Sequence, residues 1–189
     1  MRLAPFLLAC SACAALVAAR CAPAPQRLDV VIVTVDTLRA DRLSLYGYAR
    51  PTSPEIDALA ARGVAFDSAW AQAPNTNPSI ASALTSPLAP LTTVRGNAER
   101  LDPGVPTIAR VARDAGWRTG AFVSAALLRD DVCGLDPGFD VYDDEMTDPC
   151  WGHERAQRVA QRTIDRALAW LAAGDGRPAL LWVRLYDRH

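Results

Sequence analysis

The protein has 189 residues, of which 50% are hydrophobic and 22% charged, so it can bury a sizeable core and is not a disordered chain. Its 20 basic and 21 acidic residues give a net charge of -1 without a concentrated basic stretch, so we expect no nucleic acid as a partner. Because only 2 His are present, we expect any metal ion to be held mainly by oxygen ligands.

Residues 1–24 differ from the rest and predict an export signal. Met1 and Arg2 precede the apolar run FLLACSACAALVAA, which is too short to span a bilayer. A buried N-terminal helix is the alternative. Cys10 and Cys21 are candidates for lipidation, which would anchor the protein to a membrane. We therefore expect a domain over residues 25–189 in an exported protein, whether periplasmic, extracellular or an outer-membrane lipoprotein.

The first half of this domain begins with an apolar, β-branched run. LDVVIVTVD, residues 28–36, predicts a central parallel strand that is buried on both faces. Residues 53–63 predict a helix that starts at a Ser-Pro pair and ends at a glycine. VAFDSAWAQ, residues 64–72, predicts a short strand, and residues 78–86 predict the opening of a helix.

The second half continues the alternation of strands and helices. It predicts an amphipathic helix over residues 107–116, a buried strand over 117–125, a long amphipathic helix over 153–173 and a strand over 179–187. This order is typical of an α/β fold with a mostly parallel central sheet flanked by helices. Open sheets of this kind place ligands at the carboxyl ends of their strands. Since the chain stops at such an end, we expect the site to be truncated.

Cys133 and Cys150 are the two cysteines outside the predicted signal. In an oxidising compartment they could form a disulfide around the intervening loop. Two free, half-buried thiols are the equal alternative.

Two polar residues stand where chemistry is expected. Asp36 ends the first strand, where a buried carboxylate needs a partner such as a divalent cation, although it could instead cap the next turn or pair with Arg39. Thr76, in PNTNPS, precedes a predicted helix start, whose positive dipole favours an anionic ester. It could be a nucleophile or merely a solvent-facing helix cap. If both functions hold, the Thr76 hydroxyl should face Asp36 across a cleft.

Three ordered blocks of the chain resemble the sulfatase family. They are the stretch from DVVIVTVDTLRADRLSLYGY to PNTNPSIASALTS within residues 29–86, DAGWRTGAFVSAALLRDDVCGLDPGFDVYDD at 114–144, and the final LLWVRLYDRH. The resemblance implies an alkaline-phosphatase-like fold with one divalent cation, usually Ca²⁺, with Mg²⁺, Mn²⁺ or Zn²⁺ as alternatives. It places Asp36 and Thr37 at metal-ligand positions and Thr76 at the nucleophile position. His189 would contact the leaving oxygen or an ester oxygen.

The chain also departs from the family pattern. Thr76 cannot be matured to the formylglycine of ordinary sulfatases, Ile80 replaces the arginine of the nucleophile motif, and Thr92 lies near a position where relatives often have His. The family's later metal ligands and its active-site Lys would lie beyond residue 189.

The resemblance leaves three functions open. The first is a hydrolase of sulfate or phosphate-type esters. The second is a phosphoethanolamine or glycerol-phosphate type transferase with an unmodified Thr nucleophile. The third is a catalytically inactive binding domain. In each case the expected partner is a sulfated or phosphorylated small molecule or glycan.

Overall fold

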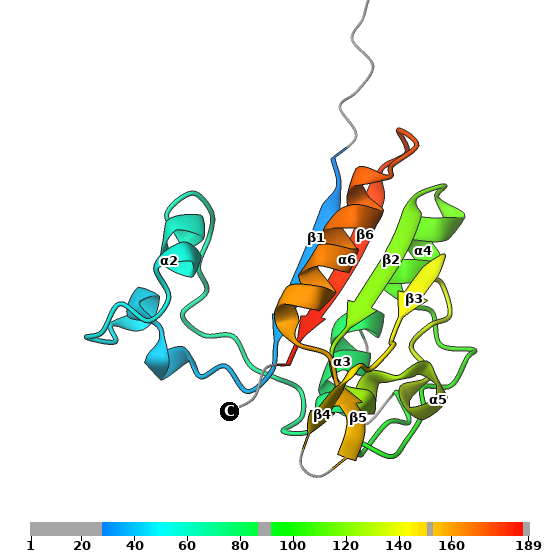
Figure 1. The fold of residues 1–189 in the computed structure, drawn as a ribbon, viewed down its shortest axis with the longest axis horizontal. Coiled ribbons are helices and arrows are strands. Elements are labelled where there is room, and N and C mark those ends of the chain that lie inside the picture. Colours follow the sequence, from blue (N-terminus) through cyan, green and yellow to red (C-terminus); the bar gives the residue numbers. More distant parts are fainter. Residues whose placement is uncertain (1–27, 87–91, 151–152, 187–189) are drawn as a thin grey trace, which may run out of the picture.

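A four-stranded parallel sheet forms the centre of the computed structural model, which describes residues 28–86, 92–150 and 153–186 (Figure 1). The strand order is β1-β6-β2-β3, and every neighbouring pair is parallel. The strands are β1 (Val30–Val35), β2 (Arg118–Val123), β3 (Val141–Asp143) and β6 (Ala179–Leu185). The predicted α/β fold with a mostly parallel sheet is therefore confirmed.

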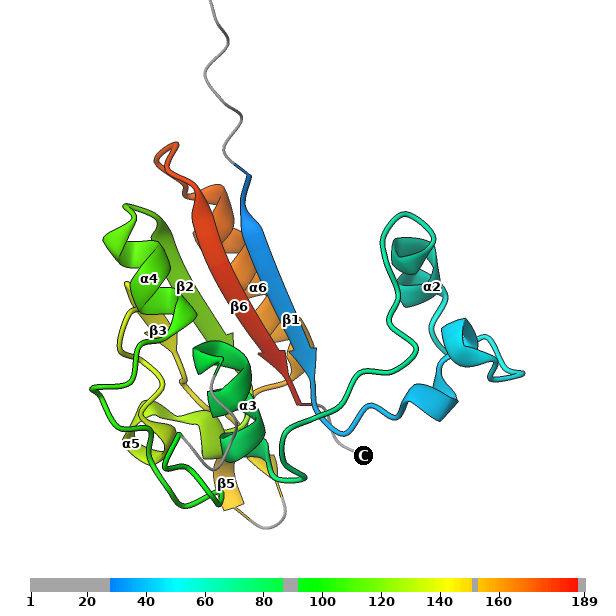
Figure 2. The same ribbon diagram turned by 180° about the vertical axis from the view of Figure 1, so that it is seen from behind.

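Helices cover both faces of this sheet. Helix α6 (Ala160–Ala172) lies on one face, and α3 (Thr76–Thr85) and α4 (Ile108–Asp114) lie on the other, as the two opposite views show (Figures 1 and 2). Because side chains alternate along a strand, β2 contributes Phe122 to the cluster under α6 and Val123 to the cluster under α3 and α4. Two apolar layers thus sandwich the sheet.

Strand β1 lies at an edge of the described sheet, contrary to the predicted central position. Its one paired neighbour in that sheet is β6. Helix α6 packs on β2 and β6, so the outward valines of β1 are uncovered, with Val31 51% and Val33 57% exposed. An apolar run identifies a strand, but the position of that strand depends on which elements cover it.

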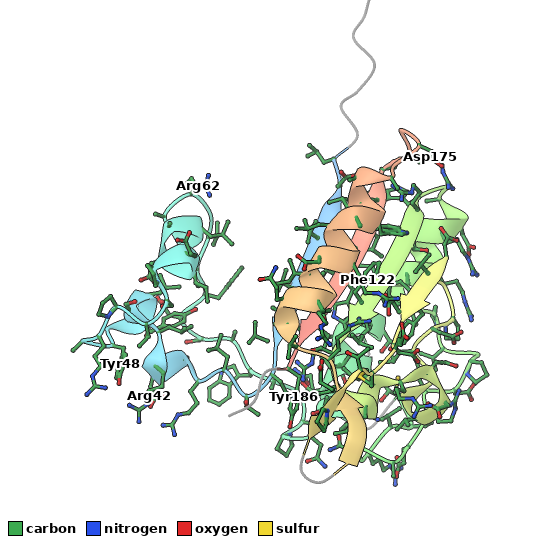
Figure 3. All side chains as sticks on the ribbon, in the orientation of Figure 1. Arg42, Tyr48, Arg62, Phe122, Asp175 and Tyr186 are labelled. Carbon is green, nitrogen blue, oxygen red and sulfur yellow. The ribbon has the colours of Figure 1, made fainter. Side chains whose placement is uncertain are left out.

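An arm extends away from the sheet between β1 and α3 (Figure 1). It carries the 3₁₀ helices η1 (Ala40–Arg42) and η2 (Ser44–Tyr46) and the helix α2 (Pro54–Ala60). Helix α2 confirms the central part of the helix predicted at 53–63. The predicted strand at 64–72 is wrong, because this stretch is irregular and exposed. Figure 3 shows Arg42, Tyr48 and Arg62 on this arm, well separated from Phe122 in the sheet.

The segment between β2 and α6 contains elements that the apolar pattern did not indicate. These are η4 (Ala126–Leu128), α5 (Asp130–Cys133) and an antiparallel pair formed by β4 (Asp148–Cys150) and β5 (His153–Gln157). The helix predicted over 153–173 therefore begins at Ala160, because residues 153–157 pair with β4 instead.

Cys133 is a free, buried thiol whose Sγ lies 3.6 Å from the Tyr142 hydroxyl. Its burial raises its pKa to about 11, which keeps it protonated near neutral pH. The free-thiol alternative therefore holds for Cys133, and the Cys150 side chain lies outside the described residues. Within the described part of the chain, every helix is too short or too polar to cross a membrane.

Candidate active site

Asp36 directly follows β1 at the carboxyl end of the sheet. Its backbone N–H donates to Leu185 O at 3.0 Å, which continues the ladder between β1 and β6 by one step. Its side chain lies on the same strand face as those of Ile32 and Thr34, the face covered by α3. The predicted placement of Asp36 at the strand end is confirmed.

Thr37 has a left-handed backbone, with φ of 50°, which is rare for a β-branched residue. Its N–H donates to Asp36 Oδ1 at 2.9 Å. This turn directs the chain away from the sheet into the arm, and Thr37 remains on the rim of the pocket described below.

Thr76 is the first residue of α3, and Asn75 is the N-cap, so the helix begins two residues earlier than predicted. Asn97 holds this helix start in place. Its Oδ1 accepts from the Asn77 N–H at 3.0 Å, and its carbonyl accepts from Asn77 Nδ2 at 2.9 Å. Thr76 is half-buried, and Asn75 rather than Thr76 occupies the cap position of this helix.

Asp36 and Thr76 line the same pocket, which has a volume of about 230 Å³. Thr37 and Asn75 form part of its rim, Ile80 lines it from α3, and Arg184 lines it from β6. The pocket is lined by the carboxyl end of β1 and the amino end of α3. Helix α3 lies on the sheet face seen in Figure 2. The structure thus brings together three of the predicted site residues, Asp36, Thr37 and Thr76.

Arg184 is the charged partner of Asp36. Its Nη2 lies 2.8 Å from Asp36 Oδ2, and its side chain is 5% exposed. Arg39, the partner in the alternative interpretation, instead forms an exposed ion pair with Asp41 at 2.6 Å. The alternative pairing of Asp36 with Arg39 is therefore wrong.

Sequence reasoning missed Arg184, although a signal was present. The strand ALLWVRL is apolar on both faces apart from this one arginine. In register, Arg184 lies opposite Thr34, two residues before Asp36 and on the same face of the sheet. An arginine inside a buried strand requires an acidic or polar partner, and the register identifies that partner.

The described residues do not by themselves form a divalent-cation site. Asp36 is the one carboxylate that lines the pocket, and Arg184 already neutralises it. In the described part of the chain, no three His, Cys, Asp or Glu residues gather closely enough to hold a metal ion. A calcium ion usually takes six to eight oxygen ligands, far more than Asp36 and Thr37 provide.

The other predicted positions do not extend the pocket. Ile80 presents an apolar wall where the family motif has an arginine. Thr92 is fully buried, with its Oγ1 accepting from the Val94 N–H at 3.4 Å, and it lies outside the pocket lining. His189 and the predicted export segment lie outside the described residues.

The sulfatase family model matches residues 29–189, which is nearly the whole of the predicted domain. The chain belongs to the sulfatase family. This confirms the resemblance read from the three sequence blocks.

One curated relative and two solved structures resemble the chain, and the structures support its fold. An N-acetylgalactosamine-6-O-sulfatase of Bacteroides thetaiotaomicron is 31% identical over 105 residues, which cover 50% of this chain and 20% of the relative. A protein solved with its substrate D-glucosamine-2-N,6-O-disulfate matches with a TM-score of 0.71 and 21% identity, covering 87% of this chain and 35% of that one. The phosphonate monoester hydrolase of Agrobacterium radiobacter matches with a TM-score of 0.65 and 20% identity, covering 85% of this chain and 41% of that one.

Proposed function

We propose that this sulfatase-family protein hydrolyses sulfate or phosphate-type esters, with Thr76 as the nucleophile. The observation that carries the proposal is the shared pocket of Thr76 and Asp36 at the carboxyl end of the sheet. Attack by Thr76 Oγ1 would form a bond to sulfur or phosphorus and release the alcohol of the ester. Water would then release the sulfate or phosphate from Thr76.

The amino end of α3 supports this role for Thr76. A helix amino end carries a partial positive charge, which stabilises the negative charge that builds up on ester oxygens during attack. Because Asn97 holds the first turn of α3 through two hydrogen bonds, Thr76 is also well positioned.

Asp36 and Thr37 remain the proposed metal ligands, with Ca²⁺ as the proposed ion. A cation would have to separate Asp36 from Arg184 and take its other ligands from outside the described residues. We therefore assign no catalytic step to the ion. His189 stays a proposed contact of the leaving oxygen.

The proposed substrate is a sulfated or phosphorylated small molecule or glycan. Support comes from the names of the matched proteins, which include a sulfated-sugar sulfatase and a phosphonate monoester hydrolase. The chain spans about a fifth of the matched curated relative and about a third to two fifths of the matched structures, so the activity belongs to the proposal. We further propose that residues 1–24 direct export, with lipidation at Cys10 or Cys21 as a route to membrane anchoring.

A catalytically inactive binding domain is the second candidate. Two observations favour it: Ile80 occupies the position of the motif arginine, and Asp36 is neutralised by Arg184. A domain of this kind would still recognise a sulfated or phosphorylated ligand.

Replacing Thr76 decides between these functions. In full-length protein assayed with an aryl sulfate and an aryl phosphate diester, Thr76→Ala should reduce kcat by at least about a thousandfold, because it removes the attacking oxygen. Thr76→Ser keeps a hydroxyl and should retain most of the turnover. Thr52→Ala, on the exposed arm, is the matched control and should leave turnover unchanged.

The possible outcomes are distinct. Undiminished turnover in Thr76→Ala contradicts the nucleophile assignment. No turnover by the unchanged protein, together with measurable ligand binding, supports the inactive binding domain instead.

A further inference from the structure

The pocket contains one cationic side chain, and it comes from a strand rather than from the nucleophile motif. Helix α3 presents Ile80, which is 7% exposed, where the family motif has an arginine. Arg184 enters the same pocket from β6. Compared with the family motif, the pocket therefore lacks a positive charge on α3. Its one cationic side chain comes from β6.

Arg184 is buried without being fully hydrogen-bonded. The residue is 4% exposed, and its Nε–H has no hydrogen-bond partner among the described residues. Guanidinium has five N–H donors in a planar fork, and the ion pair with Asp36 is made by Nη2. A buried donor without an acceptor is unfavourable by about 1–3 kcal/mol, so its retention calls for an explanation.

The charges around the pocket favour an anion as its ligand. Asp36 and Arg184 are the two charged residues that line the pocket, and their charges cancel. The amino end of α3 adds roughly half a positive charge. The pocket thus has a small positive excess, together with guanidinium donors that match the oxygens of a sulfate or phosphate group.

We propose that Arg184 binds the sulfate or phosphate group of the ligand in this pocket, supplying the positive charge that Ile80 cannot. This inference rests on the proposed function only for the class of ligand. In the metal-free protein, Asp36 then acts as the positioning partner that holds the guanidinium at the carboxyl end of β6. Thr76 lines the same pocket.

Calorimetric titration with inorganic sulfate, and separately with inorganic phosphate, tests this proposal in metal-free buffer. Arg184→Met should weaken binding of the anion by about tenfold or more, because it removes a charge-assisted hydrogen bond. Arg184→Lys keeps the charge but not the planar fork of donors. Its anion affinity should lie between that of the unchanged protein and that of Arg184→Met. Asp36→Asn should tighten binding, since it removes the carboxylate that competes for the guanidinium.

Two further variants keep the test decisive. Arg39→Met removes an arginine of an exposed pair outside the pocket and should leave affinity unchanged. If Arg184→Met fails to fold because Asp36 is left unpaired, the double variant Asp36→Asn with Arg184→Met removes both charges and should still bind the anion at least about tenfold more weakly.

Anion affinity within about twofold of the unchanged protein in the single or double Arg184→Met variant would overturn the proposal, as would a lack of anion binding by the unchanged protein. The measurement needs no turnover, so its failure is separate from that of the hydrolase proposal. Loss of anion binding in Arg184→Met with turnover unaffected by Thr76→Ala would retain the inference and reject the nucleophile.

Discussion

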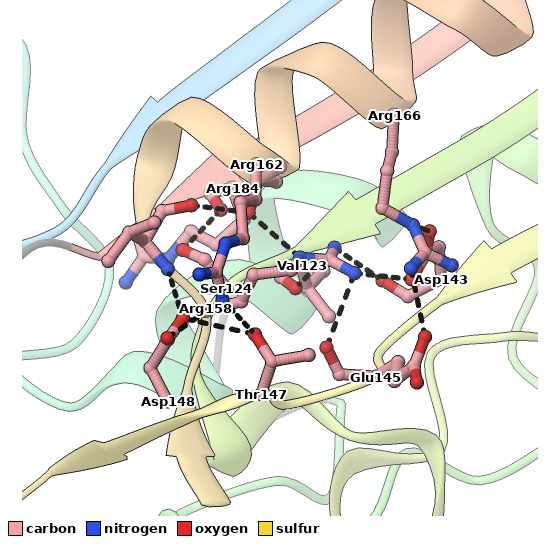
Figure 4. Close-up of polar contacts among 12 residues, drawn as sticks. Val123, Ser124, Asp143, Glu145, Thr147, Asp148, Arg158, Arg162, Arg166 and Arg184 are labelled. Carbon is pink, nitrogen blue, oxygen red and sulfur yellow. Dashed lines mark hydrogen bonds and ion pairs between the residues drawn. The ribbon is translucent and has the colours of Figure 1, made fainter.

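Arg158 is a second buried arginine, and comparison with Arg184 separates a structural role from a binding role. Arg158 is 1% exposed, and each of its guanidinium nitrogens donates to an acceptor (Figure 4). Its Nε donates to Thr163 Oγ1 at 3.0 Å, Nη1 to Asp143 Oδ1 at 2.5 Å, and Nη2 to Val123 O at 3.0 Å. Arg158 therefore joins β2, β3 and α6 and has no donor nitrogen left for a ligand, unlike Arg184.

Removal of this charge should reduce stability strongly. We expect Arg158→Met to lower the free energy of unfolding by about 3–5 kcal/mol, because it leaves the Asp143 carboxylate buried with only Arg166 as an ionic partner. Arg162→Met is the control. It breaks a more exposed pair with Asp148 and should reduce stability by less than about 1 kcal/mol. Equal losses in urea unfolding would show that the Arg158 network contributes no more than a surface ion pair.

At the scale of elements, the loop before β3 allows α4 to pack closely. Gly138 has φ of 110°, and a Cβ built there would lie 2.3 Å from Arg110 N and 2.8 Å from Arg110 Cα, both in the backbone of α4. The Thr107 hydroxyl caps α4 by accepting from the Arg110 N–H at 3.1 Å, and it also donates to Pro137 O at 3.1 Å. The loop and the helix therefore pack as one unit, and no side chain fits between them.

Comparison of Gly138→Ala with Gly116→Ala should therefore separate the cost of backbone strain from the cost of overpacking. Gly116 also has a positive φ, 83°, but a Cβ there would meet nothing within 4 Å. We expect about 1 kcal/mol of destabilisation at Gly116 from backbone strain alone. At Gly138 we expect at least about 3 kcal/mol, because strain and overpacking add. Similar unfolding midpoints for the two variants would contradict the close contact between the loop and α4.

At the scale of the whole molecule, the edge position of β1 determines how much its valines contribute to the stability of the fold. Val33 of β1 and Val183 of β6 are direct neighbours in register, yet Val33 is 57% exposed and Val183 is 5% exposed. Helix α6 covers Val183 together with Phe122 and Leu181. The two valines are therefore a matched pair that differs in whether α6 covers the side chain.

Substitution of each valine tests this coverage. Val183→Ala should lower the free energy of unfolding by about 2–3 kcal/mol, since it opens a cavity under α6. Val33→Ala should cost less than about 1 kcal/mol, because its side chain already lies largely in water. A loss at Val33 as large as that at Val183 would show that β1 is covered in the intact protein.

The sequence by itself determined the local elements and the class of fold. Apolar runs marked β1, β2 and β6, and their alternation with helical patterns indicated a parallel sheet, because side-chain periodicity is a property of neighbouring residues. The same reasoning placed Asp36 at a strand end and Thr76 near a helix start, and the family resemblance named them as a pair.

Only the tertiary structure decided which of these elements and residues meet. The pairing of β1 with β6 brings Asp36 to Arg184, and residues 153–157 join β4 rather than extending α6. The edge position of β1 likewise depends on where α6 packs. These outcomes follow from contacts between segments far apart in the chain, such as the hydrogen bond from Trp182 Nε1 to Thr34 Oγ1 across 148 residues. Local periodicity carries no information about which distant partner an element will find, because that choice depends on burial and charge pairing over the whole fold.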